Sequence, residues 1–152
     1  MSEPDDKRNA RAYGWQRLAT DYPYTYHMFR VRRDQVRWPD GHISSYAYIQ
    51  GVNAVWVVPV TPEGQIVLIR QFRYTMDDWC WEVPAGGFHD FAGDPLALAK
   101  KELAEEIGGE GDSLLYVGYF RPGVSTIDEI CHIVLARDVR LNHPPRREAG
   151  EI

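Results

Sequence analysis

The stretch KKELAEEIGG, residues 100–109, decides how this chain is interpreted. It contains three glutamates, Glu102, Glu105 and Glu106, and ends on the glycines Gly108 and Gly109. Residues three and four apart on a helix share a face, so a helix here would collect the three acids into one patch. Such a patch is either a solvated helix end or a set of metal ligands.

The sequence around this stretch predicts a helix from Asp94 to about Ile107. Asp94 is a good N-cap, and Pro95 fits the first helical position because the N–H that proline lacks is not needed there. A glycine after the last turn is a common helix end. We expect one stripe of the helix to face a core, formed by Leu96, Ala99, Leu103 and Ile107.

The acid patch would lie near the C-terminus of this helix, where the macrodipole disfavours negative charge. Like charges at this spacing also repel one another by about 0.2–0.5 kcal/mol per pair. A hard divalent cation such as Mg²⁺ would offset both effects, because it binds carboxylate oxygens. The repulsion is small, so on spacing alone a solvated face is the simpler explanation.

The composition limits the class of protein. The chain has 152 residues, 44% of them hydrophobic, which fits one domain with a real core. A net charge of −5 argues against a general nucleic-acid binder. Cys80 and Cys131 form no CxxC pair, so neither a disulfide framework nor a zinc site is expected. The start of the chain has no apolar run, and the stretch 54–60 is too short to span a bilayer, so we expect a soluble cytoplasmic protein.

The order of predicted elements indicates an α+β fold with a mixed sheet. We expect residues 1–14 to be frayed, and a run like 52–59 to be a strand buried on both faces. Residues 137–152 resemble a loop leading toward a further element, so we expect the domain to lack its C-terminal end, and the alternative is a fold that ends unusually early. The predicted strands are 24–38 and 43–50, forming a hairpin around the turn at 39–41, then 52–59, 65–72, 79–83, 113–120 and 129–136.

The predicted helix and the loop before it resemble the signature of the Nudix hydrolases. That pattern is Gly, five residues, Glu, seven residues, then Arg-Glu-aliphatic-x-Glu-Glu-x-Gly-aliphatic, and residues 102–108 match its second half. The first half departs, because Gly93 stands at the early Glu, with Asp94 beside it, and Lys101 stands at the Arg. The early Glu and the Arg commonly pair in this family. An Asp94–Lys101 pair would preserve that contact, and the alternative is that both roles are lost together.

Two further stretches resemble the ADP-ribose pyrophosphatases and related nucleotide-sugar hydrolases within this family. They are IVLIRQFRYTMDDWCWEVPAGG, residues 66–87, and YFRPGVSTIDEICHIVLA, residues 119–136. The resemblance covers about residues 25–152. It implies an α/β/α sandwich with an N-terminal β-hairpin. Residues 51–152 would form the Nudix domain, and residues 1–50, the N-terminal tail and strands, would join two copies of the chain into a homodimer.

The resemblance also implies the residues of a metal site and a catalytic base. It implies Mg²⁺, with Mn²⁺ as an alternative, and a base drawn from either the helix or a late loop, with Glu148 favoured. A charged C-terminal tail is the alternative explanation for the late acids. The expected metal ligands are Glu102, Glu105, Glu106 and a backbone carbonyl of Ala85 or Gly86, and the candidate bases are Glu105, Glu106, Glu148 and Glu151.

The candidate substrate-binding residues are Arg70, Arg73, Glu82, Ser125 and Glu129. Side chains alternate along a strand, so Arg70 and Arg73 should point to opposite faces and do different work. One could bind phosphate while the other is structural or reaches across a dimer. Solvation of the arginines, and loop-fixing hydrogen bonds from Glu82, Ser125 and Glu129, are the alternatives. Three aromatic residues could stack on a base, but core packing is the favoured role for most of them: Trp79, Trp81 and Phe88.

The activity that the resemblance implies is hydrolysis of the pyrophosphate of a nucleoside diphosphate sugar. ADP-ribose is the favoured substrate, and AMP and ribose 5-phosphate would be the products. We expect a small-molecule substrate and neither a nucleic acid nor a membrane as partner. Two alternatives stay open: a Nudix enzyme for GDP-mannose, a dinucleoside polyphosphate or a coenzyme diphosphate, or a weakly catalytic protein that senses a nucleotide sugar.

Overall fold

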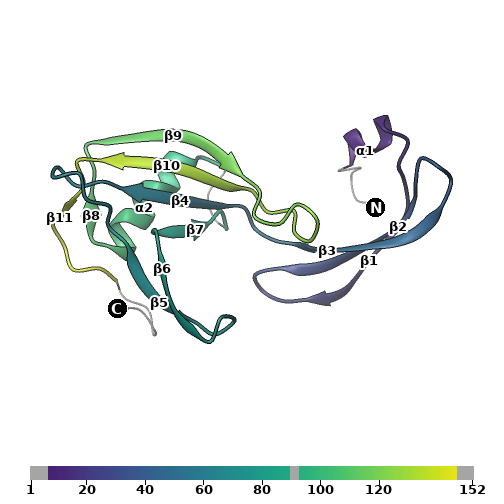
Figure 1. The fold of residues 1–152 in the computed structure, drawn as a ribbon, viewed down its shortest axis with the longest axis horizontal. Helices are drawn as coiled ribbons and strands as arrows, with labels where there is room; N and C mark the ends of the chain where they lie inside the picture. Colours follow the sequence, from purple (N-terminus) through teal and green to yellow (C-terminus); the bar gives the residue numbers. More distant parts are fainter. Residues whose placement is uncertain (1–6, 90–92, 147–152) are drawn as a thin grey trace. The chain divides into compact units, whose positions relative to one another are not determined.

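The computed structural model describes residues 7–89 and 93–146, which fold as two compact units (Figure 1). The first unit contains residues 1–51 together with residues 123–128. The second contains residues 52–122 and 129–152. The chain therefore passes between the units at three points, since the first unit borrows a short piece of chain from the middle of the second.

The first unit is a three-stranded antiparallel sheet of order β1-β2-β3 with a short helix before it. The predicted hairpin is confirmed for β2 and β3, but the sequence reasoning missed β1 and wrongly expected the N-terminal segment to be frayed as far as residue 14. Pro23 and two register shifts interrupt the regular pairing of β1, which hides its strand pattern. The elements are α1 (Arg8–Ala12), β1 (Gln16–Thr25), β2 (Arg30–Arg37) and β3 (Ile43–Gln50).

The segment 123–128 completes the first unit by extending along β3. The Ile49 N–H donates to the carbonyl of Thr126 at 2.8 Å, and the Asp128 N–H donates to the carbonyl of Ile49 at 3.1 Å. The side chain of Asp128 also accepts a hydrogen bond from the Gly51 N–H at 3.2 Å. The end of β3 is thus held by chain that follows it by more than seventy residues.

The second unit is built on a mixed sheet of order β7-β4-β10-β9. β4 and β10 are parallel, while β7 and β9 run antiparallel to their neighbours. The expected α+β fold with a mixed sheet is confirmed. The sheet strands are β4 (Ala54–Pro59), β7 (Ala85–Gly87), β9 (Ser113–Phe120) and β10 (Cys131–Arg137). The other elements are α2 (Pro95–Glu106), the hairpin β5 (Ile69–Arg73) and β6 (Asp78–Glu82), and the pair β8 (Gly109–Glu110) and β11 (Arg140–Leu141).

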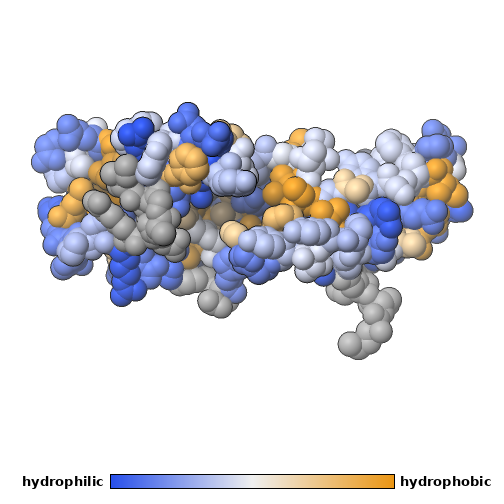
Figure 2. Space-filling model, turned by 90° about the horizontal axis from the view of Figure 1, so that it is seen from below, coloured by the Kyte–Doolittle hydropathy of each residue, from blue (hydrophilic) through white to orange (hydrophobic). Residues whose placement is uncertain are grey.

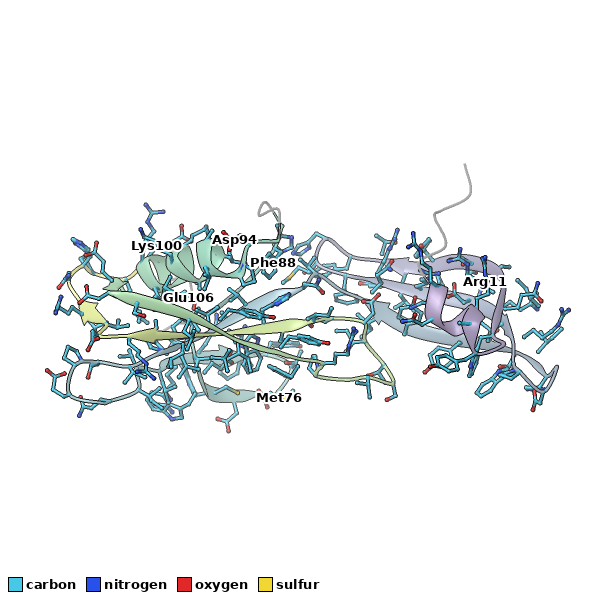
Figure 3. The ribbon with its side chains drawn as sticks, turned by 90° about the horizontal axis from the view of Figure 1, so that it is seen from above. Arg11, Met76, Phe88, Asp94, Lys100 and Glu106 are labelled. Carbon is cyan, nitrogen blue, oxygen red and sulfur yellow. The ribbon has the colours of Figure 1, made fainter. Side chains whose placement is uncertain are left out.

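Different elements lie over the two faces of this sheet. Helix α2 lies on one side of the sheet, and the turn of the β5–β6 hairpin that carries Met76 lies on the other (Figure 3). On the α2 side, Val55 and Val57 of β4 are fully buried. Trp56, between them, is 40% exposed. The prediction that this strand is buried on both faces is therefore wrong, because only its α2 face is packed throughout.

Helix α2 has the predicted start, and its predicted core stripe is buried at Ala99, Leu103 and Ile107. The Asp94 carboxylate accepts a hydrogen bond from the Leu96 N–H at 3.0 Å, as an N-cap should. The expected stripe is wrong at its first position, since Leu96 is 37% exposed whereas Leu98 is 1% exposed. The buried residues of α2 are Leu98, Ala99, Glu102 and Leu103, so one of the three acids lies on the core face. No helix in the described ranges is long and apolar enough to cross a membrane.

The segment after β10 is more ordered than the predicted loop, since β11 pairs with β8 and the chain then crosses the end of α2. The N–H groups of Asn142 and His143 both donate to the carbonyl of Gly108 at 3.1 Å. The Arg146 N–H donates to the carbonyl of Glu105 at 2.7 Å. These bonds satisfy carbonyls at and just beyond the helix end, which have no partner within the helix.

Gly108 permits this crossing, and we predict that Gly108→Ala destabilises the protein strongly. Gly108 has a φ of +60°, and an added Cβ would lie 1.8 Å from the His143 carbonyl oxygen. Gly64→Ala is the matched control, because Gly64 has a φ of +81° with nothing within 4 Å. The left-handed conformation alone costs about 1–2 kcal/mol, so Gly108→Ala should lose more unfolding free energy than Gly64→Ala in urea titrations. Equal losses would show that the close crossing is not needed.

Candidate active site

Two of the three helix glutamates lie directly against the loop strand β7. An added Cβ on Gly86 would lie 2.3 Å from both the carboxyl carbon and Oε1 of Glu102, so the Glu102 side chain occupies the space that this glycine leaves. The Ala85 N–H donates to Oε2 of Glu106 at 2.9 Å. Figure 3 shows Glu106 on the side of α2 that faces the sheet. The structure thus brings together four of the predicted metal-site positions.

Lys101 completes this group in a way that the sequence reasoning did not expect. Its Nζ lies 3.1 Å from Oε1 of Glu102 and 2.6 Å from Oε2 of Glu105. The hydrogen bond to Glu105 is the largest cause that raises the pKa of Lys101 above its ordinary value, although partial burial opposes it. Of the two alternatives for these signature positions, the Asp94–Lys101 pair is not the one observed, because Lys101 contacts Glu102 and Glu105 and Asp94 caps the helix. The i,i+4 spacing of Lys101 and Glu105 was the signal for the observed pair.

Glu105 also contacts the chain that crosses the helix end. Nη1 of Arg146 lies 3.7 Å from Oε1 of Glu105, in addition to the backbone bond between the two residues. Arg146 had not been singled out in the sequence, because nothing local links it to the helix. The candidate bases Glu148 and Glu151 lie outside the described residues.

The β5–β6 hairpin supplies an arginine and a glutamate to the same region. Nε and Nη2 of Arg73 donate to the two carboxylate oxygens of Glu82 at 2.7 and 2.5 Å. This bond is the main cause that raises the pKa of Arg73, and the negative charge of Glu106 contributes as well. Arg73 and Glu82 therefore lie within electrostatic reach of the acid cluster. The alternative of a bond from Glu82 that fixes local structure also agrees with this pair.

Arg70 lies on the other face of the hairpin, as alternation along the strand predicted. Its guanidinium carbon is 5.5 Å from the ring centroid of Trp79 and 5.5 Å from that of Trp81. Trp81 is 66% exposed, so core packing does not describe it. Phe88 is separate from both tryptophans, since it packs against the buried core and the ring of His132. The structure therefore does not gather the aromatic set into one place.

The last two predicted residues lie in different units. Ser125 belongs to the segment that completes the first unit, whereas Glu129 belongs to the second. The thiol of Cys131 donates to Oε1 of Glu129 at 3.3 Å. Together with burial, which is the larger cause, this contact raises the pKa of the Cys131 thiol to about 12.

We predict that the two thiols differ sharply in alkylation. Cys131 is 1% exposed, whereas Cys80 is half-buried. Because the thiolate is the nucleophile, labelling of Cys131 by iodoacetamide should stay low and nearly flat from about pH 7 to 10, while Cys80 reacts. Peptide mass spectrometry would measure both, with the denatured protein as the control that labels twice. Equal rates in the folded protein would contradict the buried position of Cys131.

The donor set fits a hard divalent cation. It offers three carboxylates on α2, two of which lie against the loop strand β7, where Gly86 leaves room for Glu102. Within residues 7–89 and 93–146, however, no group of three or more acidic, histidine or cysteine side chains has an arrangement ready to hold a metal ion. The ammonium of Lys101 lies between two of the carboxylates instead.

Comparison with known proteins identifies the family. A model of the NUDIX domain matches residues 50–152, which is more than half of the chain. The chain therefore belongs to the Nudix family, whose hydrolases generally use divalent metals. The expected relationship is confirmed.

Two relatives carry a more specific name. The chain is 34% identical over 131 residues to the ADP-ribose pyrophosphatase of Mycobacterium tuberculosis, covering 84% of this chain and 62% of that protein. It is 32% identical over 106 residues to the ADP-ribose pyrophosphatase of Bacillus subtilis, covering 70% and 57%. The chain thus spans less than two thirds of the length of either relative.

A solved structure shares the fold. The crystal structure of an ADP compounds hydrolase superposes with a TM-score of 0.78 at 19% identity, covering 91% of this chain and 76% of the other. At this identity the similarity establishes the fold, and the role of each residue has to come from the site itself.

Proposed function

We propose that this chain hydrolyses the pyrophosphate bond of a nucleoside diphosphate sugar, with ADP-ribose as the favoured substrate. The observation that carries the proposal is the acid cluster of α2, two of whose members contact the loop strand at Ala85 and Gly86. The names of the two pyrophosphatase relatives support the choice of substrate. The products would be AMP and ribose 5-phosphate.

The metal site of this proposal consists of Glu102, Glu105, Glu106 and a backbone carbonyl of Ala85 or Gly86. The preferred ion is Mg²⁺, with Mn²⁺ as a substitute, because all of these donors are oxygens. When bound, it would neutralise charge on the phosphate oxygens and assist deprotonation of the attacking water. The burial of Glu102 and the bond from the Ala85 N–H to Glu106 hold two of the carboxylates in place before substrate arrives.

Arg73 is the residue that we propose to bind the pyrophosphate. Nε and Nη2 of Arg73 donate hydrogen bonds to Glu82. These two bonds fix the plane of the guanidinium and leave Nη1 outside the pair. A planar donor held in this way suits a phosphate oxygen whose negative charge grows during the reaction. Glu82 is then a positioning residue. Three further residues stay as proposed substrate contacts, although no described contact joins them to the acid cluster: Arg70, Ser125 and Glu129.

Hydrolysis requires one water and one base. The water oxygen forms a bond to one phosphorus as the bridging P–O bond breaks, and its proton passes to a carboxylate. The candidates are Glu105 and Glu106 on the helix, and Glu148 and Glu151 beyond the described residues, with Glu148 favoured as in the sequence analysis. The leaving phosphate takes the electron pair of the broken bond.

We predict that Glu106→Gln lowers kcat for ADP-ribose by on the order of 100-fold, because the ligand charge is lost while the size is kept. Glutamine still offers an oxygen to the Ala85 N–H, so folding should survive. Glu63→Gln, on an exposed turn, is the matched control and should keep full activity. A coupled phosphatase assay with and without Mg²⁺ measures the turnover. Equal activity of the two variants would leave the acid cluster as a solvated face.

The same assay, run on a panel of nucleotide sugars with the unchanged protein, tests the substrate. Metal-dependent release of phosphate from ADP-ribose in preference to GDP-mannose or a dinucleoside polyphosphate supports the proposal. Preference for another nucleotide would keep the reaction and change the specificity. Binding of ADP-ribose without turnover would favour a sensor.

We further propose that residues 1–50 form a homodimer. One face of the first unit carries a cross-strand row of apolar residues, in which Tyr24 pairs with Val31 and Val31 with Ile49. Tyr24 is 54% and Ile49 is 36% exposed, and apolar residues interrupt the mostly polar surface in Figure 2. An exposed apolar row on a sheet is a common feature of interfaces.

The unpaired cysteines support a reducing compartment such as the cytoplasm.

We predict by light scattering a particle of twice the chain mass of 17.5 kDa. Ile49→Glu should convert it to a monomer, because a charge in the apolar row would be buried without a partner. Ile66→Glu is the control, since Ile66 is 58% exposed in the second unit and lies outside the proposed interface. A monomeric unchanged protein at micromolar concentration would refute the dimer.

A further inference from the structure

The acid cluster already contains a cation of its own. The ammonium of Lys101 bonds to one oxygen of Glu102 and one oxygen of Glu105, while 42% of its side chain remains exposed. The Glu102 side chain is 9% exposed and the Glu105 side chain 35%, so the ammonium joins a buried carboxylate to a half-buried one. Lys101 therefore takes up two of the oxygens that the proposed metal ion would need.

Two of the other four carboxylate oxygens of the cluster also contact the chain. Glu106 accepts the Ala85 N–H through Oε2. The second oxygen of Glu105, Oε1, faces Arg146 at 3.7 Å. Arg146 is 84% exposed, so it screens Glu105 only weakly. Lys101 thus contacts two of the three acids, and both contacts are shorter than that of Arg146.

We propose that Lys101 is the resident cation of this cluster, and that a divalent ion binds by displacing its ammonium from Glu102 and Glu105. The inference rests on the metal site of the proposed function. A hard cation approaches a carboxylate oxygen to about 2.0–2.1 Å, so its charge would repel an ammonium held on the same oxygens at 3.1 and 2.6 Å, and the two cations compete for the same acids. Lys101 has a flexible four-carbon stem and an exposed side, and it can swing into solvent when the ion enters.

Displacement gives Lys101 two opposite effects. Without metal, its charge relieves the repulsion among the glutamates and stabilises the end of α2. In the presence of metal, the same charge competes with the ion. Removing the charge should therefore weaken the metal-free protein and strengthen metal binding. A lysine that only positions the carboxylates for the metal would have the reverse effect on affinity.

The chain offers a matched control in the neighbouring residue. Lys100 is exposed, and Figure 3 shows it on the side of α2 away from the sheet. It carries the same charge on the same helix, but none of its contacts reaches the three glutamates. Lys100→Met therefore reproduces the loss of one positive charge without removing the resident cation.

The test is a titration of the full chain with Mn²⁺, in which free Mn²⁺ is measured by electron paramagnetic resonance. The Kd of Lys101→Met should fall by about 3–10-fold, as expected for loss of two partly exposed ion pairs that compete with the metal. Lys101→Arg and Lys100→Met should stay within about twofold of the unchanged protein. The melting temperature in EDTA should fall for Lys101→Met, and saturating Mn²⁺ should raise it more than in Lys100→Met.

A second measurement uses the unchanged protein and does not depend on whether a variant folds. Acylation of the lysines by an N-hydroxysuccinimide ester, read by tandem mass spectrometry, reports the exposure of Lys101 and Lys100 in one experiment. Saturating Mn²⁺ should accelerate labelling of Lys101 several-fold and leave Lys100 unchanged.

The outcomes separate this inference from the proposed function. If the unchanged protein binds Mn²⁺ but Lys101→Met binds it no more tightly, or Lys101 is not more reactive with Mn²⁺ present, the displacement is refuted and the metal site stands. If the unchanged protein does not bind Mn²⁺, the proposed metal site fails, and the displacement fails with it.

Discussion

The rotation of α2 about its axis is the constraint on which the second unit depends. It places Glu102 beside Leu98, Ala99 and Leu103 on the face that packs against the sheet. A carboxylate can lie there only because Gly86 has no Cβ, so that helix and loop strand approach closely. The bond from the Ala85 N–H to Glu106 then ties the loop strand to the last turn. One glycine and one helical rotation therefore determine where the acids lie.

Much of this could be predicted from sequence, because the signals are local. The N-cap at Asp94, the glycines after the helix and alternation in β5 depend on neighbouring residues, and each was read correctly. The errors concern distant contacts. The periodicity of α2 allows either Leu96 or Leu98 in the core, and only the sheet decides between them. The partner of Lys101 was also left open, because several acids lie within its reach. In the structure it contacts Glu105, and Asp94 accepts the capping hydrogen bond instead.

Two positively charged side chains of the site, Arg73 and Lys101, contact its carboxylates in different ways. Arg73 and Glu82 form a two-point pair whose planar geometry holds the guanidinium in one orientation. Lys101 contacts two carboxylates through a single nitrogen on a flexible stem, a geometry that holds no plane and is easily exchanged. The lysine at the arginine position of the family signature thus gives this chain a contact suited to release, while the arginine of the hairpin keeps the contact suited to orientation.

The borrowed segment 123–128 has a consequence for the order of folding. Its bonds to Ile49 and Gly51 finish the edge of β3, yet it is made after β4 through β9. During synthesis, the edge of β3 that binds this segment therefore stays without its partner until most of the second unit has been made. A contact this distant along the chain closes slowly. The first unit, although it begins the chain, is completed late.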